Sequence, residues 1–154
     1  MLEKQYLTKE KKQELQEELH NLETVKRKEI AEKLEYSRSL GDLSENAEYH
    51  DARNQQAETE SRINYLTELL KNVEIVKPHH SDKVEIGSSV TIKKKGTNDK
   101  HKYQLVNAEE ADLSQNKISY ESPMGKAMIG KTKKEEFSFE TPKGVVDYVV
   151  VDID

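Results

Sequence analysis

A chain of 154 residues can form one or two small domains, but only 33% of these residues are hydrophobic while 36% are charged. With a mean hydropathy of −0.96, this composition argues against one large globular core and favours an elongated protein with a solvent-exposed helical part. The absence of cysteine excludes disulfide frameworks and thiolate metal sites.

The distribution of apolar and charged residues limits the possible partners. No run of 18 apolar residues occurs, and the N-terminal residues lack a signal-peptide core, so we expect a soluble, cytoplasmic protein with no membrane partner. Residues 1–76 carry 17 acidic and 12 basic side chains, whereas residues 77–154 carry 13 of each. We therefore expect no tight autonomous binding to nucleic acid, which requires clustered lysine and arginine.

The first predicted element is a helix that extends from about residue 8 to about residue 40. Thr8 is a suitable N-cap, no glycine or proline interrupts the segment, and Gly41 provides a stop. Leucines spaced by four and three residues predict an apolar stripe. The stripe then slips through Val25 before it continues at Ile30.

A second helix is predicted from an apolar stripe with a more regular spacing. Its members alternate intervals of three and four residues, and they are Tyr49, Ala52, Gln56, Thr59, Ile63, Leu66, Leu70 and Val73. This is a heptad seam, and its polar middle pair makes it weakest there. Because a short connection makes neighbouring helices antiparallel, residues 1–76 should form a helical hairpin, a coiled coil roughly 50 Å long.

The hydrophobic period changes after this hairpin. Residues 77–83 contain proline and predict a linker, and alternating apolar positions over 84–154 predict a small β-rich domain. Ser122 followed by Pro123 has the form of an N-cap with proline at N1 of a short helix. The predicted fold class is therefore α+β, with an antiparallel helical hairpin followed by a β-rich domain.

Two carboxylates near the predicted hairpin tip at residues 41–48 are the main candidates for chemistry. Asp42 and Glu45 are three residues apart, so at a helix start they would lie on the same side. Two such groups can share a hard divalent cation such as Mg²⁺. The same spacing fits a capping box with Asp42 as N-cap and Glu45 at N3. Spacing alone leaves both interpretations open.

Two motifs resemble those of a known family. The first is SRSLGDLSENAEYH at residues 37–50, and the second is SPMGKAMIGK at 122–131, followed by TPKG at 141–144. They are similar to the signatures of the bacterial Gre transcript cleavage factors, of the GreA type. The resemblance covers nearly the whole chain in the right order. It implies that the C-terminal domain has an FKBP-like fold.

The resemblance also implies a function and a set of site residues. Gre factors bind RNA polymerase at its secondary channel, and their coiled coil reaches the catalytic centre. The family's tip carboxylates match Asp42 and Glu45, which would help the polymerase-bound Mg²⁺ and a water cut backtracked RNA. The factor would therefore complete the polymerase's active site without being an enzyme alone. It would need no cofactor in isolation, because the Mg²⁺ is shared with the polymerase.

Further residues match the family's contact positions. Arg38 and Arg53 match a basic patch near the extruded 3′ end of the nascent RNA, where phosphate attraction would act. Tyr49 could stack on a displaced base, although it also lies on the heptad seam. The segment from Glu121 through Ser122 to Pro123 matches the polymerase-docking surface, and Ser122 and Pro123 also suit simple helix capping.

Three other functions compete with this one. An inhibitory Gre homologue would occupy the same channel without promoting cleavage, but such homologues alter the tip, and this chain retains both acids. A prolyl isomerase would need an aromatic-lined pocket, and the chain has no Trp and two Phe. A plain coiled-coil adaptor would not require an acidic motif at the tip.

Overall fold

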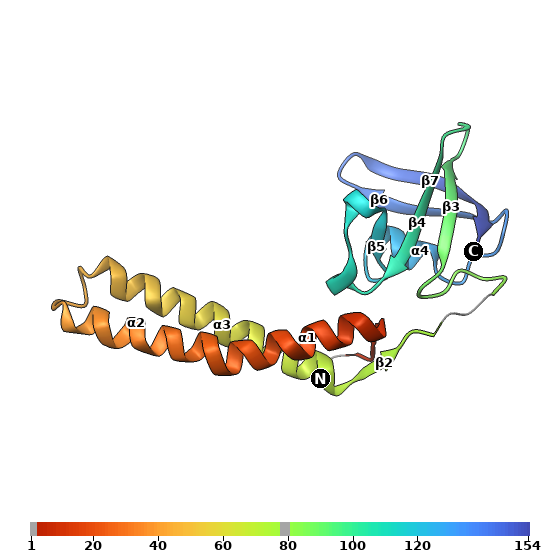
Figure 1. Cartoon of the computed structure of the whole chain (residues 1–154). Coiled ribbons are helices and arrows are strands. Elements are labelled where there is room, and N and C mark those ends of the chain that lie inside the picture. The colour runs from red at the N-terminus through yellow and green to blue at the C-terminus, as the bar shows by residue number, and fades with distance from the viewer. Residues whose placement is uncertain (1–2, 78–80) are drawn as a thin grey trace. The chain divides into compact units, whose positions relative to one another are not determined.

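The computed structural model describes residues 3–77 and 81–154 (Figure 1). The chain divides into two compact units. One contains Lys12–Val73 with the residues before Tyr6, and the other contains Tyr6–Lys11 and Glu74–Asp154. Part of the expected linker, with His79 and His80, lies outside the described residues.

The first arm of the hairpin is a long helix with one widened turn. It consists of α1 (Lys9–Asn21), a π-helical turn η1 (Leu22–Lys26) and α2 (Arg27–Ser39). The Thr8 hydroxyl accepts a hydrogen bond from the backbone N–H of Lys11 at 3.2 Å, so the predicted N-cap is confirmed. The π turn lies where the predicted apolar stripe slips, and Val25 within it is 49% exposed.

The second arm is α3 (Ala47–Lys71), which lies beside α2 (Figure 1). Most of the predicted seam is confirmed, because Ala52, Thr59, Ile63 and Leu66 are buried. The fully buried leucine near its end is Leu69 rather than Leu70.

The prediction that Val73 continues this seam is wrong. The helix ends at Lys71, and Val73 begins β2 (Val73–Ile75), which pairs with β1 (Gln5–Leu7) in a two-stranded sheet. The N–H of Gln5 in β1 donates to the carbonyl of Asn72, directly before β2, and the N–H of Val76, directly after β2, donates to the carbonyl of Leu7, both at 2.8 Å. A partner distant in sequence therefore ends the helix.

The second unit contains a five-stranded sheet and a short helix, α4 (Pro123–Met128). The sheet order is β5-β4-β3-β7-β6, and all neighbours are antiparallel except β4 and β5. The strands are β3 (Ser89–Lys94), β4 (Lys100–Val106), β5 (Lys117–Ser119), β6 (Glu136–Thr141) and β7 (Gly144–Ile153). Short 3-10 turns, η2 (Ala108–Glu110) and η3 (Leu113–Gln115), connect β4 to β5. A helical hairpin and a β-rich domain confirm the predicted α+β class.

Alternating side chains of these strands make the core of the second unit. Val90, Ile92, Leu105 and Val150 are fully buried, and Met128 of α4 packs with them. Period-two burial on β3 follows from the pleat, which points successive side chains to opposite faces. The core therefore forms between α4 and one face of the sheet.

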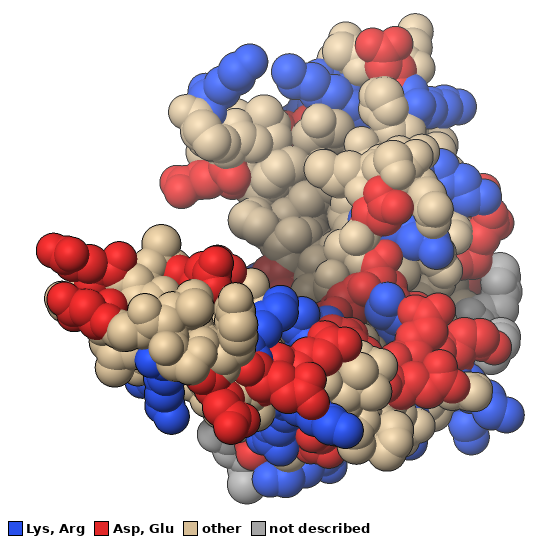
Figure 2. Space-filling model, turned by 60° about the vertical axis from the view of Figure 1, so that its left-hand side comes forward, with Lys and Arg blue, Asp and Glu red and all other residues tan. Residues whose placement is uncertain are grey.

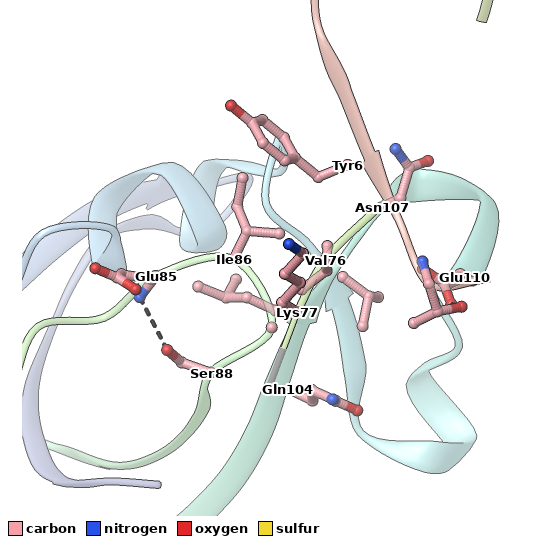
Figure 3. Close-up of a pocket in the computed structure, with 13 residues that line it drawn as sticks. Tyr6, Val76, Lys77, Glu85, Ile86, Ser88, Gln104, Asn107 and Glu110 are labelled. Carbon is pink, nitrogen blue, oxygen red and sulfur yellow. Dashed lines mark hydrogen bonds between the residues drawn. The ribbon is translucent and has the colours of Figure 1, made fainter. Parts of the chain in front are cut away.

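The segment that contains Tyr6 packs on this core. The Tyr120 hydroxyl accepts hydrogen bonds from the Tyr6 N–H at 3.4 Å and from Asn107 Nδ2 at 3.2 Å. Burial raises the pKa of this hydroxyl, so Tyr120 stays neutral. Beside it, a cavity of about 250 Å³ has Tyr6, Asn107 and Glu110 in its lining, as Figure 3 shows. The Thr8 hydroxyl donates to Glu110 at 2.7 Å, which fixes the start of α1.

Among the described residues, no helix combines the length and apolar character needed to cross a bilayer.

Candidate functional site

The candidate site is the tip loop, residues 40–46, which joins α2 to α3. Gly41 adopts a φ of 112°, which favours glycine, and a Cβ there would meet nothing within 4 Å. This conformation lets the chain turn sharply where α2 ends. Acidic side chains surround the end of the hairpin that comes forward in Figure 2. Asp42, Glu45 and Glu48 are all exposed there.

The capping-box alternative for Asp42 and Glu45 is wrong. Helix α3 begins at Ala47, so both acids precede it and neither lies in its first turn. Asp42 Oδ1 instead accepts hydrogen bonds from the Ser44 N–H at 3.1 Å and the Ser44 hydroxyl at 2.9 Å. This local Asx turn shapes the loop and uses one carboxylate oxygen of Asp42.

Asn46 performs the capping instead. Its Oδ1 accepts from the Tyr49 N–H at 3.0 Å, and its Nδ2 donates to the carbonyl of Ser37 near the end of α2. A carboxylate could cap α3 but could not donate to the Ser37 carbonyl. An amide side chain can do both, so it caps α3 and also holds the loop to α2. Sequence analysis missed this role. The signal was an asparagine, which is a favoured N-cap, directly before a helical pattern.

The two loop carboxylates have oxygens available for a ligand. Asp42 and Glu45 line one shallow hollow with Leu40, Ala47 and Glu48. Neither Asp42 Oδ2 nor the Glu45 carboxylate has a partner among the described residues. Free oxygens suit a hard divalent cation that keeps several waters. No group of three or more ligating side chains forms a metal site in the described part of the chain, so a cation here would need ligands from elsewhere.

The structure brings two of the three predicted RNA-contacting residues together. The guanidinium of Arg38 lies 6.0 Å from the centre of the Tyr49 ring. Tyr49 is half-buried and packs against a cluster that includes Ile30 and Ala52, which supports the packing role that its seam position predicted. Arg53 lies on α3, about one turn from Tyr49, and its Nη1 donates to Gln56 at 3.0 Å.

The predicted docking residues lie at the start of α4 in the second unit. The Ser122 hydroxyl accepts from the Gly125 N–H at 3.1 Å and donates to the Ser119 carbonyl at 2.6 Å. Ser122 therefore caps α4, with Pro123 at N1 as predicted, while Glu121 and Pro123 stay exposed. A mainly apolar groove of about 460 Å³ lies beside them, and its lining includes Pro123 and Leu113.

Comparison with known proteins identifies the family. The family model described as "Transcription elongation factor, N-terminal" matches residues 5–75, and "Transcription elongation factor, GreA/GreB, C-term" matches residues 77–154. The chain belongs to the GreA/GreB family. A protein named "Transcription elongation factor GreA" from Caldanaerobacter subterraneus subsp. tengcongensis is 44% identical over 149 residues, which cover 96% of this chain and 95% of the relative. The protein of the same name from Prosthecochloris aestuarii is 44% identical over 152 residues, which cover 96% and 95%.

Family membership confirms the resemblance and places the chain among transcription elongation factors. It also fixes the general nature of its activity, because a transcription elongation factor is an accessory protein of the transcription machinery.

The dual role of Asn46 in this Gre factor predicts different effects for two substitutions. Asn46→Asp keeps an acceptor for the Tyr49 N–H but loses the bond to the Ser37 carbonyl, and Asn46→Ala loses both. We expect Asn46→Ala to lower the free energy of unfolding of the hairpin by about 1–2 kcal/mol, as other cap deletions do. Asn46→Asp should cost less stability but should still release the loop from α2. Urea unfolding monitored by circular dichroism measures the first effect, and amide exchange at residues 40–46 measures the second.

Asn54→Ala, at an exposed position on α3, serves as the control, because no described side-chain hydrogen bond involves Asn54. Loop exchange that stays at the wild-type rate in Asn46→Asp would show that the bond to Ser37 does not hold the loop.

Proposed function

We propose that this chain binds bacterial RNA polymerase at the secondary channel and stimulates the polymerase's own cleavage of backtracked RNA. The observation that carries this proposal is the pair of exposed carboxylates, Asp42 and Glu45, on the loop that ends a helical hairpin. A narrow hairpin can enter a channel that excludes a globular domain. The cleaved RNA would have a new 3′ end, from which elongation resumes.

The tip carboxylates would act together with groups of the polymerase. Asp42 Oδ2 and the Glu45 carboxylate would hold a Mg²⁺ shared with the polymerase active site. A bound Mg²⁺ supplies charge stabilisation and activates water for phosphodiester attack. Two exposed carboxylates hold such an ion weakly in water, so the tip alone has no nuclease activity. The protein is therefore an accessory factor whose site the polymerase completes.

The basic and aromatic residues beside the tip would position the RNA. Arg38 and Arg53 carry positive charge on the two helices that lead to the acidic tip, and RNA phosphates attract such groups. Arg38 also packs on Tyr49, which limits the orientations of both side chains. We propose that this pair contacts the extruded 3′ end of the nascent RNA. Tyr49 would act mainly by orienting Arg38, because its ring is half-buried.

Glu121, Ser122 and Pro123 would dock the second unit on the polymerase. Glu121 and Pro123 are exposed, and Ser122 fixes their backbone through its cap of α4. The groove beside Pro123 is mainly apolar, so a partner protein that binds there would bury apolar surface away from water. Docking through the second unit would leave the hairpin free to enter the channel.

The inhibitory homologue remains the second candidate function, and one experiment distinguishes the two. Arrested complexes of a cognate RNA polymerase are incubated with the protein, Mg²⁺ and nucleotides, and full-length transcript is measured. We expect the arrested complexes to resume elongation. Slower elongation with no recovery of arrested complexes would support the inhibitory homologue, and no effect at all would contradict polymerase binding.

A further inference from the structure

The first arm of the hairpin contains a π turn in its middle. The backbone N–H of Arg27 donates to the carbonyl of Leu22, five residues earlier, instead of four as in an α-helix. The dihedral angles remain helical on both sides, since Asn21 has φ −62° and ψ −43° and Arg27 has φ −58° and ψ −42°. The Thr24 hydroxyl donates to the His20 carbonyl at 2.7 Å, a bond that tends to bend helices.

The positions of the buried residues explain why the turn is widened. Leu15 and Leu34 are both buried, at 2% and 6% exposure. They are 19 residues apart in the sequence, whereas about 18 residues make five full α-helical turns. In a regular helix the extra residue would rotate Leu34 by about 100° away from the face of Leu15. The π turn takes up this residue, so both leucines stay on one face.

The packing around this turn is weak. No residue between Leu15 and Ile30 is buried, although the structure describes every residue of this interval. On α3, which η1 contacts, the seam is polar at the half-buried Gln56 and the buried Thr59. Bending at this place would therefore disturb little buried apolar surface.

Exposed ion pairs hold the arms together on either side of the turn. Arg62 binds Glu18 at 2.8 Å and Arg27 binds Glu60 at 2.8 Å, each with two hydrogen bonds. Side-chain exposures between 34% and 46% make such pairs weak and easily exchanged for water. They can maintain the contact between the arms while the helix bends.

We propose that the π turn Leu22–Lys26 is a flexible joint that lets the distal hairpin adjust the position of its tip loop. This inference rests on the proposed function, because the adjustment matters when the tip meets a site supplied by the polymerase. A helix with one residue stored in a widened turn can bend there without breaking its other hydrogen bonds. The helices α1 and α2 can then change their angle at the π turn while each remains straight.

Deletion of Thr24 tests the joint. After the deletion the two leucines at positions 15 and 34 are 18 residues apart instead of 19, so a regular α-helix keeps both on one face and the hairpin still folds. We expect amide exchange at residues 20–27 to become roughly tenfold slower than in the wild type. We also expect roughly fivefold slower stimulation of RNA cleavage in a backtracked complex, at unchanged affinity for the polymerase.

Thr24→Ala is the matched control, because it removes the bond to His20 and keeps the extra residue. It should retain exchange and cleavage within about twofold of the wild type. A Thr24 deletion that unfolds the hairpin, or that stimulates cleavage at the wild-type rate, would overturn the joint. Failure of the wild-type protein in the same assay would instead contradict the proposed function.

Discussion

We expect alanine at either Asp42 or Glu45 to remove most of the stimulation of RNA cleavage while polymerase binding is retained. The expected loss is on the order of 100-fold in the cleavage rate, because a metal ion that stabilises charge contributes several kcal/mol to the barrier. Both side chains are exposed on the tip loop, and the Glu45 carboxylate has no partner among the described residues, so its replacement removes no internal contact. Cleavage of end-labelled RNA in backtracked complexes gives the rate. Competition between variant and wild-type protein gives the affinity.

Two further variants separate the chemistry of the tip from its shape. Glu48→Ala removes a neighbouring exposed carboxylate that follows the cap of α3, and it should retain most of the activity. Ser44→Ala removes the hydroxyl bond to Asp42 but leaves both carboxylates in place. If Asp42→Ala and Glu45→Ala cleave as fast as Glu48→Ala, the tip carboxylates do not supply the chemistry.

The second large effect is expected from Gly125→Ala in α4. A Cβ at this position would lie 2.2 Å from the backbone oxygen of Ser119 and 2.9 Å from Cα of Tyr120. Both are backbone atoms, so the strand and the helix must separate to admit a methyl group. We expect the substitution to destabilise the second unit by about 3 kcal/mol, at the upper end of overpacking costs. Thermal unfolding of the full chain, followed by calorimetry, measures this loss.

The Gly125 variant should also weaken polymerase binding. The N–H of Gly125 bonds to Ser122, which holds the exposed residues Glu121 and Pro123 in place. Lys126→Ala, at an exposed position of the same helix, is the control and should change stability by less than about 0.5 kcal/mol. A Gly125→Ala protein with wild-type stability would show that α4 can move away from Ser119 at little cost.

The hydrophobic period predicted most of the fold. The seam from Ala52 to Leu66 was visible because helix burial recurs every three or four residues. The slip of the first stripe near Val25 was visible, but a continuous helix was predicted there, because the choice of a π turn depends on where Leu15 and Leu34 pack. The spacing shows that the segment has one residue more than whole α-helical turns require. The packing of the helix determines which turn is widened to include it.

The parts that sequence analysis missed depend on contacts between distant residues. The pairing of β1 with β2 ends α3 before Val73, and no local signal at Val73 distinguishes a helix end from a strand. The role of Asn46 depends on Ser37, which is nine residues earlier on the other arm. Asp42 had the right spacing for a cap, but Asn46 was closer to the helical pattern and offered both a donor and an acceptor.

The acidic tip loop carries only two of the side chains that a metal site would need. Asp42 and Glu45 present free oxygens at the end of the hairpin, but no third ligating side chain joins them in the described part of the chain. Under the proposed function, two carboxylates alone would hold Mg²⁺ too weakly to cut RNA in solution. Activity would then depend on the polymerase, which we propose supplies the remaining ligands.

The most direct test of this account measures cleavage of a labelled backtracked RNA under three conditions, all with Mg²⁺. The conditions are the protein with the RNA alone, the cognate polymerase complex alone, and the two together. We predict no shortened RNA with the protein alone, slow cleavage by the polymerase complex, and much faster cleavage when both are present. RNA cut by the protein alone, or equal cleavage with and without the protein in the polymerase complex, would contradict the account.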